Sequence, residues 1–135
     1  MILLCLIQSN YASELHEINL PPSSEFGLGP KSSQKGIYKV SIVTPEPLRK
    51  RRMQSIRAHV TDINGNLIEN ANILIDGGMP QHNHGLPTKP RVTKNLGQGD
   101  YQIEGLRFNM GGWWEVKLFI SSEFGEDTVI FNIDL

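Results

Sequence analysis

The chain has 135 residues, of which 39% are hydrophobic and 20% charged, a composition typical of one globular domain and not of a disordered or coiled-coil protein. Its 13 basic and 14 acidic residues leave a formal net charge of −1, so no overall field attracts nucleic acid or an anionic membrane. A single cysteine excludes a disulfide within the chain.

The first twelve residues predict a secretory signal peptide. Residues 1–7 form an apolar run far shorter than the roughly 20 residues of a membrane-spanning helix, and small polar residues follow it. No Lys or Arg precedes the run, which predicts that it is the end of a longer, truncated signal. We expect cleavage near Ala12, removal of Cys5 with the signal, and a secreted, periplasmic protein with no retained membrane span.

Residues 13–35 are rich in Ser, Pro and Gly and show little periodicity. This composition predicts a flexible leader or an extended edge segment. We expect the compact domain to occupy residues 36–135.

From Gly36 onward, apolar residues alternate with polar ones over short stretches, and no window of helical length has helical spacing. The predicted strands cover residues 37–43, 53–61, 67–76, 91–95, 101–108, 113–120 and 128–135. Turn residues such as Asn64-Gly65 separate them. Seven short strands with these turns predict an all-β, seven-stranded immunoglobulin-like β-sandwich, whose inner faces form the core.

Alternation also predicts which side chains are buried. In the sixth strand it assigns one face to the core, namely Trp114, Val116, Leu118 and Ile120. Trp113 then points the other way, where we expect it to cover the end of the sandwich near Met110 or to contact a partner or a sugar. In the last strand the same argument buries Val129, Phe131, Ile133 and Leu135.

Successive strands of a sandwich run from one end to the other, so its first, third and fifth connections share an end. The first connection carries four consecutive cations, Arg49–Arg52 (the basic turn), the third carries His82 and His84, and the fifth carries Met110. We therefore expect these groups to lie near one another.

Several motifs of this chain occur together in a known family. They are Met79-Pro80-Gln81-His82-Asn83-His84-Gly85, the pieces Leu106-Arg107-Phe108-Asn109-Met110 and Gly112-Trp113-Trp114, and a Pro-rich break at residues 44–47. In these motifs the chain resembles YtkA-like domains and the related periplasmic part of FixH-like proteins, over roughly residues 36–120. The resemblance implies a secreted immunoglobulin-like domain linked to copper handling or oxidase maturation, with a protein partner in metal transfer.

His82 and His84 are separated by one residue, so in an extended segment both would project from the same side, about 6.6 Å apart along the chain. Met79 and Met110 would add thioethers, which are soft ligands and select Cu(I). Zinc prefers a thiolate or carboxylate beside imidazoles, and the loop has neither. The predicted copper ligands are therefore His82, His84, Met79 and Met110. The alternative is that both histidines are solvated and both methionines fill the end of the core.

Other polar residues carry weaker signals. We expect His59 to be an exposed strand residue, while His16 belongs to the leader. The basic turn is expected to be a solvated loop or a contact for an acidic partner. No Ser has a recognisable His and Asp context, and carboxylates are not paired near the loop, so we expect a non-catalytic protein.

The predicted function is therefore a secreted copper-binding accessory or metal-delivery protein. The alternative is a non-metal immunoglobulin-like interaction module, in which the same loop and the basic turn bind a protein or carbohydrate partner. Nucleic acid is not an expected partner, because the single cluster of cations lacks stacking aromatics.

Overall fold

A computed structural model describes residues 18–135 of the chain. The predicted signal at residues 1–12, with Cys5, and the start of the leader, with His16, lie outside the described residues. Within residues 18–135, no helix has the length and hydropathy needed to cross a membrane.

The described part of the chain contains one short 3-10 helix, η1 (Ser23–Glu25), and nine strands. The strands are β1 (Lys31–Ser32), β2 (Tyr38–Val43), β3 (Gln54–Asp62), β4 (Asn72–Met79), β5 (His84–Gly85), β6 (Arg91–Gly97), β7 (Asp100–Leu106), β8 (Trp113–Ser122) and β9 (Gly125–Asp134). All seven predicted strands are present, within a few residues of their expected bounds. The two-residue strands β1 and β5 had no predicted counterpart.

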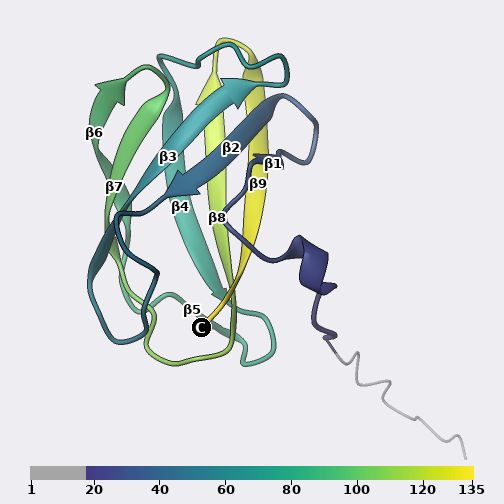
Figure 1. Cartoon of the computed structure of the whole chain (residues 1–135), viewed down its shortest axis with the longest axis vertical. Coiled ribbons are helices and arrows are strands. Elements are labelled where there is room, and N and C mark those ends of the chain that lie inside the picture. Colours follow the sequence, from purple (N-terminus) through teal and green to yellow (C-terminus); the bar gives the residue numbers. More distant parts are fainter. Residues whose placement is uncertain (1–17) are drawn as a thin grey trace, which may run out of the picture.

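The strands pair antiparallel in the order β1-β2-β3-β7-β6-β4-β8-β9, with β5 added to β4 (Figure 1). One layer is β2-β3-β7-β6 and the other is β4-β8-β9, the strand order of an immunoglobulin constant-type sandwich. The two layers meet at a single register pair, Leu74 opposite Arg91. The predicted all-β, immunoglobulin-like sandwich is confirmed.

The core lies between the layers, and the alternation in β8 places its side chains there. Trp114, Val116, Leu118 and Ile120 are each at most 1% exposed, as predicted. Burying side chains of this size contributes about 1.5–3 kcal/mol each. In β9, Val129, Phe131 and Ile133 are buried as expected, and Leu135 is partly buried.

Trp113 was expected to be either a cover for one end or an aromatic contact for a partner or a sugar. The second expectation is wrong, because Trp113 is 6% exposed and its Nε1 donates a hydrogen bond to Asn132 Oδ1 at 3.0 Å. Asn132 Nδ2 in turn donates to the Glu25 carbonyl at 3.3 Å. The segment around η1 therefore covers this corner of the sandwich.

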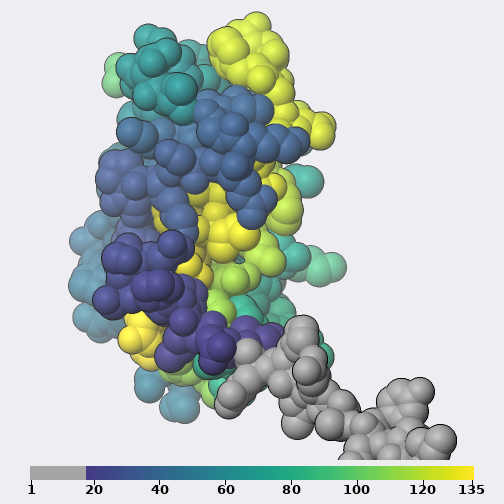
Figure 2. Space-filling view, turned by 90° about the vertical axis from the view of Figure 1, so that its right-hand side faces the viewer, coloured from purple at the N-terminus to yellow at the C-terminus, as the bar shows by residue number. Residues whose placement is uncertain are grey.

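Residues 26–35, which the sequence placed in the leader, pack between β2 and β9. β1 pairs with β2, while Gly27 and Gln34 donate backbone hydrogen bonds to β9, at Asn132 and Thr128. Figure 2 shows this purple to dark-blue segment lying against the yellow C-terminal strand. The sequence allowed either a flexible leader or an extended edge segment. Residues 26–35 form an extended edge segment. The packed domain thus begins before Gly36.

A second difference concerns Gly77 and Gly78, which lie beyond the end of the predicted strand at residues 67–76. Both belong to β4 and pair with β8, Gly77 opposite Val116 and Gly78 opposite Glu115. A Cβ at Gly77 would collide with the Glu115 carbonyl, and one at Gly78 would lie 2.5 Å from the His84 carbonyl. Glycine is present here because neighbouring backbones approach closely, which is a different use from a turn.

The predicted meeting of three connections at one end is confirmed by their contacts. Arg51 N donates to the Phe108 carbonyl at 2.6 Å, which joins the first connection to the fifth. The His84 ring lies 5.7 Å from the Trp114 ring, and Trp114 Nε1 donates to the Met110 carbonyl at 3.0 Å. Trp114 therefore links the third connection to the fifth.

Candidate metal site

The two histidines lie on a tight hairpin between β4 and β5. Met79 pairs with His84 across the ladder, and His82 N donates to the Met79 carbonyl at 3.1 Å. Asn83 has a φ of +49°, a left-handed conformation that asparagine tolerates better than most residues. The expectation that His82 and His84 share an extended segment is therefore wrong, because the chain turns through Asn83.

Despite the turn, the two imidazoles face each other. Their ring centroids are 5.9 Å apart and their planes are inclined by 30°. His82 is exposed and His84 is half-buried. An imidazole binds an ion in the plane of its ring, so both rings would have to rotate out of this stacked arrangement to share an ion at about 2.0–2.1 Å from one nitrogen of each.

Aromatic residues of the core support His84 from below. Its ring meets Trp114 at an interplanar angle of 71°, and Trp114 meets Phe108 in the same edge-on manner, with centroids 5.2 Å apart. His84 Nδ1 lies 3.4 Å from the Gly85 carbonyl, a long and weak contact. In the tautomer that donates to this carbonyl, Nε2 is left as the metal-binding atom.

Met79 lies directly beneath this pair. Residues directly opposite in an antiparallel ladder project from the same face, so the Met79 and His84 side chains are neighbours. Met79 is 2% exposed, and its Cε lies 2.9 Å from the position that a Cβ would take at Gly112. The thioether is therefore at the closed, inner side of the cluster.

Met110 lies on the neighbouring connection and is 36% exposed. The contact that ties Met110 to the cluster is the hydrogen bond from Trp114 Nε1 to its carbonyl oxygen. The structure thus brings His82, His84 and Met79 together, and it places the Met110 backbone one side chain away from them.

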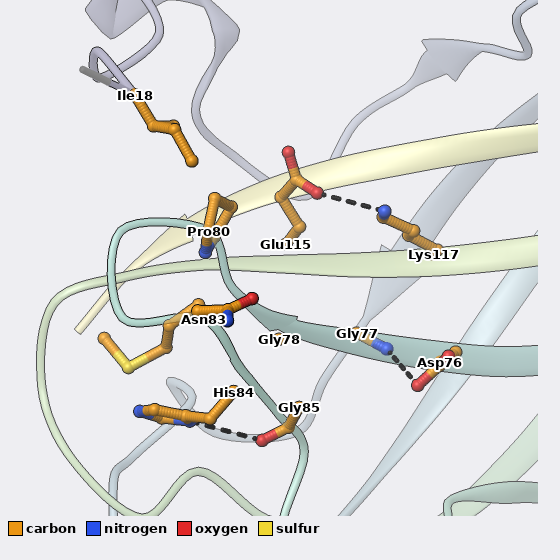
Figure 3. Close-up of a pocket in the computed structure, with 11 residues that line it drawn as sticks. Ile18, Asp76, Gly77, Gly78, Pro80, Asn83, His84, Gly85, Glu115 and Lys117 are labelled. Carbon is orange, nitrogen blue, oxygen red and sulfur yellow. Dashed lines mark hydrogen bonds and ion pairs between the residues drawn. The ribbon is translucent and has the colours of Figure 1, made fainter. Parts of the chain in front are cut away.

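A shallow groove of about 420 Å³ opens beside His84 on the outer face of β4 and β8 (Figure 3). It exists because Gly78 has no side chain opposite Glu115 on that face. Glu115 pairs with Lys117 at 3.3 Å, and Ile18 lies over the far side, where its carbonyl accepts a hydrogen bond from Gln81 Nε2. The groove gives solvent a path to His84.

The donor atoms at this end are imidazole nitrogens and thioether sulfurs. Within residues 18–135, no group of three or more His, Cys, Asp or Glu side chains is arranged to hold a metal ion. Imidazole and thioether donors suit soft ions such as Cu(I).

His59 behaves differently from the loop histidines. Its Nδ1 lies 2.7 Å from Asp100 Oδ1, and Arg57 Nε lies 3.7 Å from the other oxygen of the same carboxylate. Ser41 is opposite His59 in the ladder, so a row of Ser, His and Asp crosses three strands. No hydrogen bond joins Ser41 to His59 in the described part of the chain. The row lies on the outer, solvent-facing side of the layer β2-β3-β7-β6.

Sequence reasoning missed the role of Trp114 as the link between His84 and Met110. Alternation assigns Trp114 to the core, but it does not reveal where the indole N–H points. The contact of Ile18 with the histidine hairpin was also missed, because Gln81 and Ile18 are far apart in the chain.

A family model described as YtkA-like matches residues 32–119. No curated protein matches the chain. Among solved structures, the chain is similar to one described as the ZirS C-terminal domain, with 14% identity, a TM-score of 0.40, and coverage of 100% of this chain and 94% of the other. A likeness at that TM-score carries no argument about this chain.

Proposed function

The chain belongs to the YtkA-like family, and from that premise we propose that it is a non-catalytic, copper-binding accessory domain that acts outside the cytoplasm. The observation that carries the proposal is the facing pair His82 and His84, with ring centroids 5.9 Å apart on an accessible hairpin. The proximity of the two rings supports the proposal, because both side chains can reach one ion after rotation about their side-chain bonds.

The methionines have different roles in this proposal. Met79 is buried beneath His84 and supplies a thioether from the inner side, where a soft Cu(I) ion would be sheltered from water. Met110 is partly exposed on a separate connection, so its side chain can approach or leave without disturbing the hairpin. Two or three ligands at an open end permit release of the ion to a better site, whereas a closed cage would retain it. This suits delivery to a partner, such as a protein in oxidase maturation.

Anaerobic Cu(I) titration of the protein tests the proposal. We expect one ion per chain, and we expect His82→Ala with His84→Ala to abolish binding. His59→Ala is the matched control, because this histidine is held by Asp100 and is not paired with another imidazole among residues 18–135. Equal affinity of the double variant and the wild type would refute the site.

Trp114 offers a second readout in a parallel titration with Cu(II). Because the His84 ring is 5.7 Å from the Trp114 ring, binding of Cu(II) at the hairpin should quench Trp114 fluorescence. Trp113→Phe removes the other tryptophan, so the signal then comes from Trp114 alone.

The pH dependence separates the imidazoles from the thioethers. A ligating imidazole must be neutral, because a proton competes with the ion for the same nitrogen, so copper affinity should fall as the pH is lowered from about 8 to about 5. Binding through methionine alone would not change over this range. A flat affinity from pH 8 to pH 5 would therefore contradict the histidine site.

The alternative is a non-metal interaction module that binds a protein or a carbohydrate. The structure supports a protein partner better than a carbohydrate partner. Burial of Trp113 removes the exposed aromatic residue that a carbohydrate partner would have used. The basic turn remains as a contact for protein. This surface is compatible with metal delivery as well.

A further inference from the structure

We propose that the basic turn, Arg49–Arg52, is a docking surface for an acidic segment of a partner protein, held beside the candidate metal site. The consequence of docking, transfer of an ion between the two proteins, rests on the proposed function. The docking surface itself rests on the charge, the geometry and the backbone strain of the turn.

The fold does not use these four charges. All four residues are exposed. In the described part of the chain, the turn makes one ion pair, between Arg52 and Glu46 at 3.9 Å. Both of its side chains are more than half exposed, and such pairs contribute between zero and about 1 kcal/mol. Because the whole chain has a net charge of −1, the cluster does not reflect a generally basic protein.

The backbone of the turn is nevertheless fixed at several points. The Gln54 side chain accepts a hydrogen bond from Arg49 N at 2.7 Å and donates one to the Arg49 carbonyl at 2.8 Å. Arg51 N donates to the Phe108 carbonyl, and Leu48 packs against the core. The cations therefore extend from a rigid base, which reduces the entropy lost when a partner binds.

Arg51 adds an argument from strain. Its φ of +62° lies in the left-handed region, which costs a non-glycine residue roughly 1–2 kcal/mol. Glycine or asparagine would adopt this conformation more easily. An arginine that is strained and exposed is more readily explained by a task for its side chain than by the needs of the fold.

The turn also lies next to the candidate site. The Lys50 ammonium is 3.6 Å from the position that a Cβ would take at Gly111, the residue after Met110. On its other side, the turn borders a hollow of about 230 Å³ lined in part by Leu48, Met53, Arg49 and Arg52. Met53 is 57% exposed, so cations surround an accessible apolar surface.

These features define the chemistry of the partner. Four cations repel a free metal ion, so the turn does not serve to capture one. They complement carboxylates, and the hollow accepts an apolar side chain set among them. None of the residues that line the hollow is aromatic, and nucleic-acid strands are usually bound through aromatic stacking. An acidic protein segment with an apolar residue is therefore the favoured occupant.

The test uses the whole chain and a fluorescent peptide of glutamates around a central leucine. Arg49→Gln, Arg51→Asn and Arg52→Gln together remove three cations, and asparagine suits the left-handed backbone at residue 51. Lys39→Gln, Arg91→Gln and Lys94→Gln remove the same charge from exposed positions on the strands. We expect the first variant to bind the peptide at least about tenfold more weakly than the wild type, and the control to change less than about twofold.

Two further arms identify the occupant and the surface. Binding of the peptide should weaken as salt is raised and should shift the amide NMR signals of residues 48–54 and 107–111. Vesicles containing phosphatidylserine and a short single-stranded DNA serve as competing anions. Equal losses in the two variants, or tighter binding of either competitor than of the peptide at the turn, would overturn the proposal.

The same variants separate docking from metal binding. The triple variant of the basic turn should still bind one Cu(I), whereas the variant lacking His82 and His84 should still bind the peptide. Loss of copper binding in both variants would overturn the division of roles. The expected result is that the histidine variant loses copper binding and still binds the peptide. If the wild type did not bind copper, the proposed function would be refuted, and the peptide measurements would still decide whether the basic turn is a docking surface.

Discussion

The two ends of the sandwich treat their polar groups in opposite ways. One end holds the 62–66 turn and the start of β9 and lies at the top of Figure 1. There the carboxylates accept hydrogen bonds from other groups of the chain. Asp62 accepts hydrogen bonds from Asn64 and Asn66, and Asp127 accepts them from Ser33 and from backbone amides. At the opposite end, the imidazoles of the histidine hairpin and the cations of the basic turn face solvent.

The pKa values follow this division. The hydrogen bond from the Asn66 side chain, together with backbone amides, holds the pKa of Asp62 below its ordinary 3.8. For Asp127, burial opposes ionisation, but hydrogen bonds from Ser33, Lys35, Thr128 and Ile37 outweigh it and lower the pKa. One end therefore uses its charges for stability, while the other keeps its polar groups available for binding. Activity and stability commonly compete in this way.

Trp114→Ala should have the largest effect on stability, because Trp114 is the core residue on which the histidine end packs. It is fully buried against Phe108 and His84, and truncation of such a side chain costs about 3–5 kcal/mol of unfolding free energy. Urea unfolding at pH 7 measures the loss. Phe124→Ala, at a residue 57% exposed, is the control and should change stability by less than about 0.5 kcal/mol. A loss of unfolding free energy below about 1 kcal/mol for Trp114→Ala would contradict the claim that burial of Trp114 stabilises this end.

Asp127→Asn should come next, with a loss of about 1–3 kcal/mol at pH 7, because the buried donors around it would lose their carboxylate. The folded-state pKa of Asp127 is lowered, so its contribution is fully present above the unfolded value of about 3.9 and is lost as the pH falls through the folded value. Urea unfolding of both proteins between pH 7 and pH 3 should show the gap narrowing below about pH 4. A gap independent of pH would indicate that the charge is not the cause.

Arg51→Gly should produce the smallest change, and of opposite sign. Relief of the left-handed strain should raise the unfolding free energy by about 0.5–1 kcal/mol, less the entropy cost of glycine. Arg49→Gly removes the same charge at a residue without a positive φ and should lower stability. Thermal unfolding compares the two variants. If both changed stability in the same direction, charge repulsion and not backbone strain would account for the effect.

Much of the fold could be predicted because apolar residues recur at every second position in β2, β8 and β9, and these positions form the core face of each strand. Turn residues then separate the strands clearly enough to fix the topology and the meeting of three connections. The C-terminal end of β4 could not be predicted in this way. Gly77 and Gly78 read locally as turn residues, whereas their place in the ladder depends on how closely β5 and β8 approach them.

The candidate site was less accessible from sequence. The spacing of His82 and His84 predicted that their rings would be close, but the reason given, an extended segment, was wrong at Asn83. The packing of Met79 under His84 depends on a hairpin register that composition does not encode. Whether these four side chains bind copper together stays a prediction.

The segment before β2 has a consequence for association between molecules. Its backbone amides at Gly27 and Gln34 occupy carbonyl groups of β9, the last strand in the order, and so shield an edge that would otherwise recruit a strand from another chain. A chain shortened to begin at Gly36 would lose this shield together with Ser33, a partner of Asp127. The stretch that looks most like a dispensable tail in the sequence therefore covers backbone groups of β9 to which another chain could otherwise add a strand.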